Sequence, residues 1–464
     1  MARIPSLLLP PLLLLVAQTT GLSTVNLGAV EAKPIDRQLI SLSIDGPQRV
    51  QDNLTETMYN IFEPGNAEAV NTTYSKRLFQ VLAQNSGPEQ TYIFGLNLGS
   101  SLSFLLTPAF NFKTKHFIEI TAAATYLNQS RILAYEVGNE PNLYTYTGLR
   151  NASWNVLEYA DEILDWMPRL REAAGGQRFP GYQFGTIAEP PSAFGDFTQV
   201  QLAVMGVPQA IGSNVCTTQQ AAAVTIDYYL NHLNTVTYFA NWVDEIAAAE
   251  SLGLPFHMGE TGTAGCHGKD GVSNTLGALL REIDYALYAT TLGMRRLFFH
   301  NGGGGVFYYS MWEPVALNAS SPAHVNPTYY SMLFLADLTS DLPTPRVHRL
   351  RHLDTYDLAH YAIYNDQTFT KLVILNTHLY NDTRSTAAAS RPEKFVNVSP
   401  VLGQRVQIRR LTGPSSVAKT GVTWKGQEEV VERVADGVVR VAASEGVVVQ
   451  VDRTSWAMEA LVHS

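Results

Sequence analysis

The feature that most constrains this fold is an alternation of short apolar runs with longer helical segments between about residues 38 and 345. Apolar runs bounded by turn residues predict strands at Leu39–Ile44, Tyr92–Leu98, Ile132–Val137, Tyr182–Ile187, Phe256–Met258 and Arg296–His300. Helical periodicity between them predicts helices such as Trp154–Ala173, Ile226–Leu252 and Leu276–Leu292. Alternating strands and helices imply an α/β fold with a parallel sheet, here a (β/α)8 TIM barrel over residues 38–345, with a doubly wound sheet as the alternative.

The pattern changes after Pro345. Strand-like runs such as Leu372–Leu375, Arg405–Leu411 and Val447–Val451 are separated by Gly, Pro, Ser and Asn clusters. Several short strands with turn residues between them are typical of an all-β, sandwich-like domain. We therefore expect a second, β-rich domain over residues 346–464.

The N-terminus has the features of a secretory signal peptide, predicted over residues 1–21. Arg3 precedes an apolar run, Leu7 to Ala17, which is followed by small and polar residues. A membrane anchor is the alternative, but the run is too short to span a bilayer and contains Pro10 and Pro11. The sequence thus predicts a secreted, extracellular protein.

Two further features bear on export. Sequons for N-glycosylation occur at Asn53, Asn71, Asn128, Asn151, Asn318, Asn381 and Asn397. The two cysteines, Cys216 and Cys266, are candidates for one disulfide in an oxidising compartment, and their spacing matches no zinc site. The net charge of −9 argues against a nucleic-acid partner and against a polybasic membrane patch.

Two glutamates follow predicted strands at glycine-containing turns. Glu140 stands in Val-Gly-Asn-Glu-Pro, and Glu260 stands in His-Met-Gly-Glu-Thr, 120 residues later. The C-terminal ends of all strands in a parallel barrel face the same way and hold the active site. Two carboxyl groups about 5–5.5 Å apart there are the requirement for a retaining glycosidase. The alternative for each glutamate taken alone is a surface position.

Neighbouring residues add detail to this carboxylate pair. The Asn139 amide is placed to donate to a sugar hydroxyl beside the reaction centre. Strand alternation suggests that Glu136 points away from Glu140, although their even spacing requires the strand to end between them. His257 and His300 are predicted to be strand histidines with satisfied hydrogen bonds. We expect neither a metal nor a cofactor, since two carboxylates suffice for the reaction.

The chain resembles a known family at these residues. Tyr-Glu-Val-Gly-Asn-Glu-Pro-Asn-Leu-Tyr is similar to the acid/base motif of clan A glycosidases. The stretches 92–99, 254–268 and 295–302 resemble fungal β-glucuronidases of glycoside hydrolase family 79, which are related to heparanase. The resemblance implies Glu140 as acid/base on strand four and Glu260 as nucleophile on strand seven. It also implies that an N-terminal segment, here 24–31, joins the C-terminal β domain.

Further substrate-binding residues are predicted from this resemblance or from their place at the end of a predicted strand. Asp45 matches an acidic residue after the family's first strand, with a turn aspartate as the alternative. Asn97 ends the third strand, where a turn asparagine is equally plausible. Family members have a tyrosine that contacts the substrate carboxylate. In this chain the corresponding segment contains Tyr309, our first candidate for this contact, and Tyr308, our second. Buried core aromatics are the alternative for both.

The chain departs from the family pattern after the first strand. Residues 45–52 leave no room for a helix of ten or more residues and a second strand, so parts of the first and second βα units are predicted to be missing. The sixth strand expected before residue 207 is not evident either. The sequence predicts a secreted retaining glycosidase that releases β-linked glucuronic or 4-O-methylglucuronic acid from a glycan substrate. The alternatives are an inactive carbohydrate-binding remnant or a gene-model error of that family, and a clan A glycosidase for neutral sugars.

Overall fold

The computed structural model of the chain describes residues 22–28, 31–43, 59–61, 72–74, 76–96, 115–146, 148–175, 179–184, 186–188, 197–198, 201, 211–213, 224–265, 267–302, 307–313, 316, 322–381, 391–424 and 432–451. The predicted signal peptide and the short junction at 45–52 lie outside these residues. No helix within the described ranges is long and apolar enough to cross a membrane.

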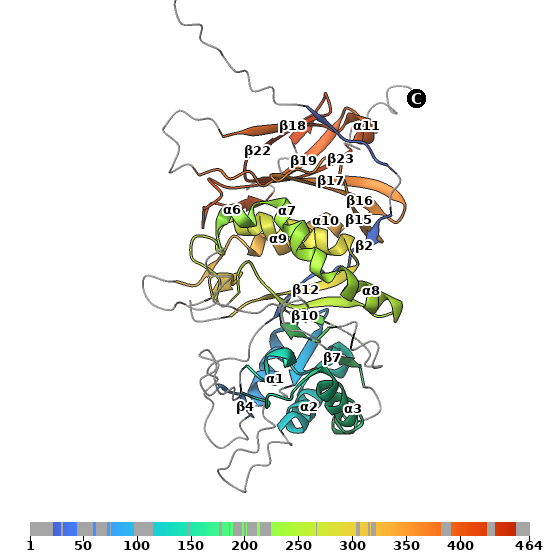
Figure 1. The fold of residues 1–464 in the computed structure, drawn as a ribbon. Coiled ribbons are helices and arrows are strands. Elements are labelled where there is room, and N and C mark those ends of the chain that lie inside the picture. Colours follow the sequence, from blue (N-terminus) through green and yellow to red (C-terminus); the bar gives the residue numbers. More distant parts are fainter. Residues whose placement is uncertain are drawn as a thin grey trace, which may run out of the picture.

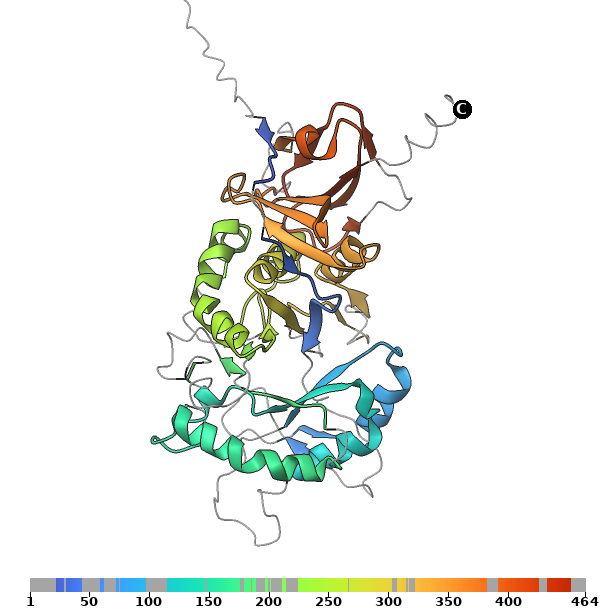
Figure 2. The ribbon, with the colours of Figure 1, turned by 90° about the vertical axis from the view of Figure 1, so that its right-hand side faces the viewer.

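Two parallel sheets form the central part of the molecule (Figures 1 and 2). One has the order β3 (Ile40–Ser43), β12 (Met294–His300), β11 (Phe256–Thr261), β10 (Ile211–Ser213) and β9 (Ile187–Ala188). The other has the order β6 (Tyr92–Leu96), β7 (Ile132–Val137) and β8 (Tyr182–Gln183). A parallel bridge between Asn139 and Thr186 joins them where β8 runs on into β9. This strand order is the one expected of a parallel α/β barrel.

The described strands leave one barrel position open. β3 pairs only with β12, and β6 pairs only with β7, so no described strand stands between β3 and β6. The hairpin of β4 (Tyr59–Ile61) and β5 (Thr72–Tyr74), which comes between them in the chain, is antiparallel and forms a separate sheet. Residues 44–58 and 62–71, in this part of the chain, lie outside the described residues, so the loss of parts of the first and second βα units stays a prediction.

The strand predictions hold with one correction. The expected strands are present, and Tyr182–Ile187 is divided into β8 and β9. A sixth strand is present, but it is β10, which lies after residue 207 and pairs with β9 and β11. It was overlooked because it has only three residues, Ile-Gly-Ser, and too short a pattern to indicate a strand.

Helices cover the outer faces of both sheets. The second sheet packs on α1 (Lys76–Asn85), α2 (Lys115–Tyr126) and α3 (Val156–Ala173) through one apolar cluster. The predicted helix Ile226–Leu252 is broken into α6 (Ile226–Tyr229), α7 (His232–Phe239) and α8 (Val243–Ser251), with a 3-10 turn before α8. The break arises because Asn231 caps a new helix by accepting a hydrogen bond from Leu233 N.

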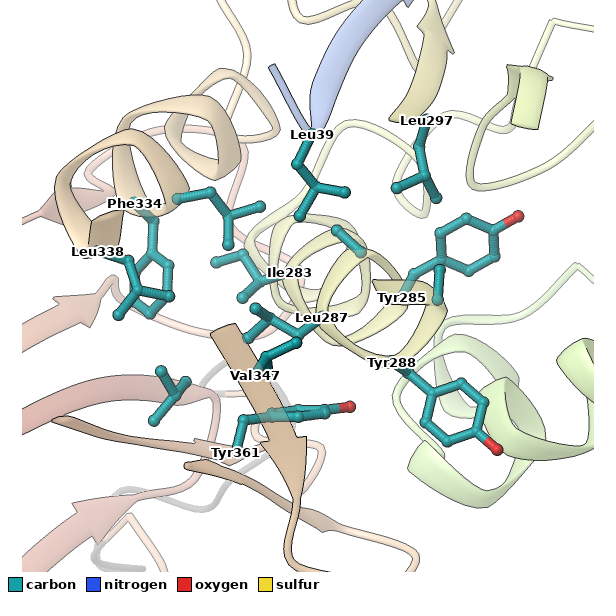
Figure 3. Close-up of a cluster of buried hydrophobic side chains, with 14 of the residues drawn as sticks. Leu39, Ile283, Tyr285, Leu287, Tyr288, Leu297, Phe334, Leu338, Val347 and Tyr361 are labelled. Atoms are coloured by element: carbon teal, nitrogen blue, oxygen red, sulfur yellow. The ribbon is translucent and has the colours of Figure 1, made fainter. Parts of the chain in front are cut away.

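The central helix α9 (Leu276–Thr291) is buried on all sides from Leu276 to Thr290. Its apolar side packs on the sheet at residues such as Leu39 and Leu297, and its other side meets α10 (Tyr329–Thr339) and the C-terminal β domain (Figure 3). The periodic pattern of an amphipathic helix leaves one face of α9 that the sheet does not cover. The β domain covers that face, so the barrel and the β domain share one core.

The C-terminal domain consists of two packed sheets. The larger has the order β2 (Lys33–Pro34), β15 (Pro345–Arg349), β16 (Leu358–Asn365), β17 (Thr368–Asn376), β23 (Glu445–Val451), β19 (Val406–Thr412) and β20 (Thr423–Trp424), with β21 (Glu432–Val434) also on β19. The smaller has β1 (Ser23–Thr24), β18 (Glu393–Asn397) and β22 (Val438–Ala442). The continuous apolar run of β17 has a simple cause: Leu372 and Ile374 face the smaller sheet, while Val373 and Leu375 face α9. The N-terminal strands β1 and β2 thus lie in the sheets of this domain.

A buried ionic cluster lies where the β domain meets α7 and α9. His232 Nδ1 is 2.8 Å from Asp284 Oδ1, and His232 Nε2 is 3.3 Å from Asp354 Oδ2. Arg349 Nε donates to Asp354 Oδ2 at 2.6 Å, and the Tyr361 hydroxyl donates to Asp284 Oδ1 at 2.6 Å. Burial alone lowers the pKa of His232, but the charges of Asp284 and Asp354 outweigh it and raise that pKa to about 9.

This cluster predicts that the protein loses stability as the pH rises. The pKa of His232 is 6.5 in an exposed site and about 9 here, so the folded protein holds a proton that the unfolded chain releases between these values. The contribution is complete below pH 6.5 and is lost as the pH rises through 9, about 3 kcal/mol for His232 alone. Burial also raises the pKa of Glu282 to about 8, which acts in the same direction. Urea unfolding at pH 6 and pH 9 measures the change, and a higher unfolding free energy at pH 9 would contradict it.

Candidate active site

Glu140 lies directly after β7 in an unusual backbone conformation. Its φ of 50° is in the left-handed region, and it follows Gly138, whose φ is 85°. Of the other described non-glycine residues with positive φ, Asp366 lies in the hairpin turn between β16 and β17, and Ser444 lies in the tight turn between β22 and β23, where such angles are common. Glu140 has no hairpin that would require this angle, and left-handed backbone costs about 1–2 kcal/mol for such a residue. Strain of this kind is found at functional sites.

The surrounding loop is held rigidly. Glu140 N donates to Thr186 O at 2.8 Å, which ties the glutamate to the strand that continues into β9. The buried Asn142 side chain donates to Ala188 O at 2.8 Å and accepts from Ala188 N at 2.9 Å. Trp154 Nε1 donates to Pro141 O at 2.8 Å. Asn142 was not predicted as a site residue. Its residue type is nevertheless suited to this role, because an asparagine side chain can both donate to and accept from backbone groups.

We predict that Asn142→Leu destabilises the protein and distorts this loop. The substitution leaves the buried N–H and C=O of Ala188 without partners, at an expected cost of about 2–4 kcal/mol in the free energy of unfolding. Urea unfolding measures it, with Asn241→Leu as the control, because Asn241 is exposed and makes one side-chain hydrogen bond. Equal effects of the two substitutions would contradict the role given to Asn142.

Glu260 lies in β11, next to its last residue, and a bulge turns its side chain inward. Phe256 and Met258 face the helices, and strict alternation would send Glu260 the same way. However, Gly212 and Ser213 of β10 pair with Met258 and Glu260, so one strand has an extra residue. Thr261 consequently faces outward and donates to the Tyr285 hydroxyl of α9 at 3.0 Å. Bulges re-aim side chains in this manner next to active sites.

The side chains around Glu260 come from β12 and the loop that follows it. His300 Nδ1 lies 3.7 Å from Glu260 Oε1, and His300 is buried. The rings of His300 and Tyr309 meet edge to face with centroids 5.6 Å apart. Tyr309 is buried against the loop after β11, where a Cβ on Gly262 would lie 3.5 Å from its ring. Tyr308 is 39% exposed, so the two tyrosines differ sharply in setting.

Glu136 requires a correction, because it points into the barrel and does not face away. Tyr135 and Val137 pack toward the helices, and Glu136 lies on the opposite side of β7. Gln183 Nε2 donates to Glu136 Oε2, and the charge of Glu260 acts on Glu136. Part of the side chain stays accessible, yet burial of the carboxyl dominates and raises the pKa of Glu136 to about 7. β7 ends at Val137, and the left-handed turn then separates Glu136 from Glu140.

His257 also departs from expectation. Its Nδ1 is buried and has no hydrogen-bond partner among the described residues, and burial together with the charge of Arg296 lowers the pKa of His257 to about 4. It lines a cavity of about 660 Å³ with Asp36, Gln183 and Arg296. These residues lie in or just before the N-terminal halves of the strands, whereas Glu140 and Glu260 lie at the C-terminal ends. The cavity is therefore at the barrel end opposite the predicted reaction centre. That end of a barrel is associated with stability and not with catalysis.

Other predicted residues are placed as follows. Asp45, Asn97, Cys216, Cys266, Asn53, Asn71 and Asn318 lie outside the described residues. Asn139 is exposed and forms the bridge to Thr186. Asn128 and Asn151 are exposed, whereas Asn381 and Asn397 are partly buried. No group of His, Cys, Asp or Glu side chains within the described ranges is arranged to hold a metal ion.

Sequence comparisons give two kinds of match. Residues 360–458 match the family model described as the glycosyl hydrolase family 79 C-terminal beta domain. A β-glucuronidase from Neurospora crassa is 26% identical over 354 residues, which cover 66% of this chain and 62% of that protein. A β-glucuronidase from Aspergillus niger is 27% identical over 367 residues, 73% of this chain and 65% of that protein. The chain thus spans less than two thirds of the length of each curated relative.

Structural comparisons agree on the fold. The crystal structure of a 4-O-α-L-rhamnosyl-β-D-glucuronidase from Fusarium oxysporum superposes with a TM-score of 0.71 at 17% identity, and covers 92% of this chain and 100% of that one. A bifunctional glucanase-xylanase from a metagenome library superposes with a TM-score of 0.51 at 10% identity, over 90% of this chain and 96% of that one. The family match and the two curated relatives together confirm the resemblance of this chain to glycoside hydrolase family 79.

Proposed function

We propose that this protein is a secreted retaining glycosidase that releases β-linked glucuronic or 4-O-methylglucuronic acid from glycans. The resemblance to β-glucuronidases supports a glycoside hydrolase of glucuronidase type. The observation that supports the proposal best is that the backbone departs from regular geometry at both of the glutamates predicted from the sequence. Glu140 has left-handed backbone, and a bulge turns Glu260 toward the barrel interior.

The proposed reaction follows from two carboxyl groups with different tasks. Glu140 donates a proton to the leaving oxygen while Glu260 attacks the anomeric carbon and forms a covalent glycosyl-enzyme. Glu140 then takes a proton from water, which attacks the same carbon and releases the sugar with retained configuration. Tyr309, in ring contact with His300, is the proposed donor to the sugar carboxylate.

Hydrolysis of an aryl β-glucuronide tests the activity, and NMR of the first product gives its anomeric configuration. We expect a β-configured product and turnover that exceeds that of the matching aryl β-glucoside. Faster hydrolysis of the glucoside would instead favour a glycosidase for neutral sugars.

Glu140→Asn is predicted to separate activity from stability. Asparagine accepts left-handed backbone readily, so the free energy of unfolding is expected to stay constant or to rise by up to about 1 kcal/mol. Turnover is expected to fall about 10²–10⁴-fold, because the general acid is lost. Thermal unfolding and aryl glucuronide kinetics measure the two effects. A clear loss of stability would show that the strain is not at Glu140.

The short junction at residues 45–52 favours a second candidate, an inactive carbohydrate-binding remnant. No described strand stands between β3 and β6, and the chain is shorter than its curated relatives. Sequencing of the transcript across residues 45–52 distinguishes a gene-model error from a true deletion. Binding of glucuronate by calorimetry without any turnover would favour the remnant.

Secretion and glycosylation belong to the same proposal. Asn128 and Asn151 are exposed, and each side-chain oxygen accepts from the serine two residues later. A loss of mass after enzymatic removal of N-glycans from the secreted protein is the expected result.

A further inference from the structure

Glu136 is an acidic group inside the barrel that the proposed reaction leaves unused. It lies on β7, four residues before Glu140 in the sequence. Gln183 of β8 donates a hydrogen bond to its carboxyl group. On the other side is β6, where a Cβ on Gly95 would lie 3.7 Å from Glu136 Oε1. The Thr186 hydroxyl lies near the carboxyl without completing a hydrogen bond of normal geometry. Neighbouring strands on both sides thus enclose the carboxyl.

Among the residues that the structure describes, no positively charged side chain acts on Glu136. The ionisable side chains on the parallel strands around it are Glu260 and His257 of β11 and His300 of β12. Arg295 and Arg296 of β12 lie at the opposite barrel end, where Arg296 pairs with Asp36, and Tyr92, Tyr135 and Tyr182 pack toward the helices. β3, β9 and β10 carry no ionisable residues. Among the described residues only Glu260 exerts a charge effect on Glu136, and its sign is unfavourable for ionisation. A buried carboxyl without a cation keeps its proton more readily than an exposed one.

Glu136 and Glu260 are both partly exposed, and it is their neighbours that divide the charge between them. The Glu260 side chain is 27% exposed and has the His300 ring nitrogen 3.7 Å away. Among the described residues, the Gln183 amide donates a hydrogen bond to Glu136, and the Thr186 hydroxyl lies nearby. When two nearby carboxyls compete, the one whose charged form has the better-placed neighbours ionises first and then opposes ionisation of the other.

We propose that Glu136 is a positioning residue that stays protonated beside Glu260, so that the barrel interior holds one negative charge and not two when an anionic sugar binds. This rests on the proposed function, because the advantage applies to a uronate substrate. Ionisation of Glu136 would place a second negative charge in the same low-dielectric space as the sugar carboxylate. Glu136 therefore sets the upper pH limit for binding of uronates, and it does not limit neutral sugars.

The first test needs no enzymatic activity. Infrared spectra of protein with isotope-labelled glutamate carboxyls, recorded from pH 4 to 9, follow protonated carboxyl groups directly. The wild type minus Glu136→Gln difference is expected to contain one carboxyl that titrates near pH 7. In Glu260→Gln this step should move to lower pH, because the charge that opposes ionisation is gone. A difference spectrum whose carboxyl titrates between pH 4 and 5 would overturn the proposal.

The second test measures KM for an aryl β-glucuronide between pH 6 and 8.5. With an effective dielectric constant of about 20, ionisation of Glu136 is expected to raise KM on the order of tenfold. Glu136→Gln should remove most of this rise and leave kcat at pH 6 within a few-fold of wild type. Glu282→Gln is the matched control: Glu282 is also buried with a raised pKa, but it lies on α9 and bonds Ser331, outside the barrel interior.

The outcomes separate the two proposals. A KM rise that persists in Glu136→Gln, or a loss of kcat at every pH in that variant, would overturn the positioning role. Absence of turnover in the wild type would count against the proposed glucuronidase, while the infrared titration would still decide whether Glu136 holds its proton.

Discussion

Glu260→Ala is expected to lower turnover of an aryl β-glucuronide by about 10⁴-fold or more, because the variant has no group that can attack the anomeric carbon. The bulge in β11 makes this residue a reasonable nucleophile, since Glu260 faces inward between two outward residues, Met258 and Thr261. Glu172→Ala, which removes an exposed carboxylate at the end of α3, is the control and should retain full turnover.

Added azide gives this prediction a second readout. A small anion can occupy the space left by the Glu260 carboxylate and attack the sugar itself, so it should restore turnover and give the α-glycosyl azide. The α configuration is specific for a missing nucleophile, because azide that replaces a missing acid/base would attack the glycosyl-enzyme and give the β-glycosyl azide. Unchanged turnover in Glu260→Ala would rule out the role proposed for Glu260.

Asp354→Asn is expected to lower the free energy of unfolding by about 3–5 kcal/mol, since it leaves the buried charges of His232 and Arg349 without their common partner. Hydrogen bonds from His232 and His360 and the charges of His232 and Arg349 outweigh burial and keep the pKa of Asp354 well below its usual range. The cluster joins the β domain to α7 and α9, so the loss should affect the shared core.

Asp366→Asn makes the same chemical change at an exposed site. Asp366 lies 3.7 Å from Arg346 Nε, and both side chains are accessible, so this pair should contribute about 0–1 kcal/mol. Urea unfolding at pH 6 compares the two variants. Similar losses for both would mean that the buried cluster adds nothing to stability.

The sequence predicted most elements and missed features that depend on neighbouring chains. Ile132–Val137 was predicted with its observed bounds, because an isolated apolar run next to Gly-Asn identifies a strand well. α9 was predicted, but its full burial depends on the β domain, which local periodicity does not report. β10 was missed because it is held by β9 and β11 and has little pattern of its own.

The candidate site shows the same division. Both glutamates could be named from the sequence, because each stands beside glycine at the end of an apolar run. The inward direction of Glu260 depends on a bulge against β10, and the inward direction of Glu136 depends on the packing of Tyr135 and Val137 against the helices. Asn142 could be recognised only from its pairing with Ala188, which is distant in the chain.

The central claim is that Glu260 forms a covalent bond to the sugar, and labelling with a 2-deoxy-2-fluoro-β-glucuronyl fluoride tests it most directly. The fluorine at C2 slows both steps and the fluoride leaving group speeds the first, so the glycosyl-enzyme accumulates. Peptide mass spectrometry should find one added 2-fluoroglucuronyl group, on the peptide that contains Glu260 and on that side chain. A label on Glu136 or on another residue, with the wild type active on the aryl glucuronide, would contradict the account.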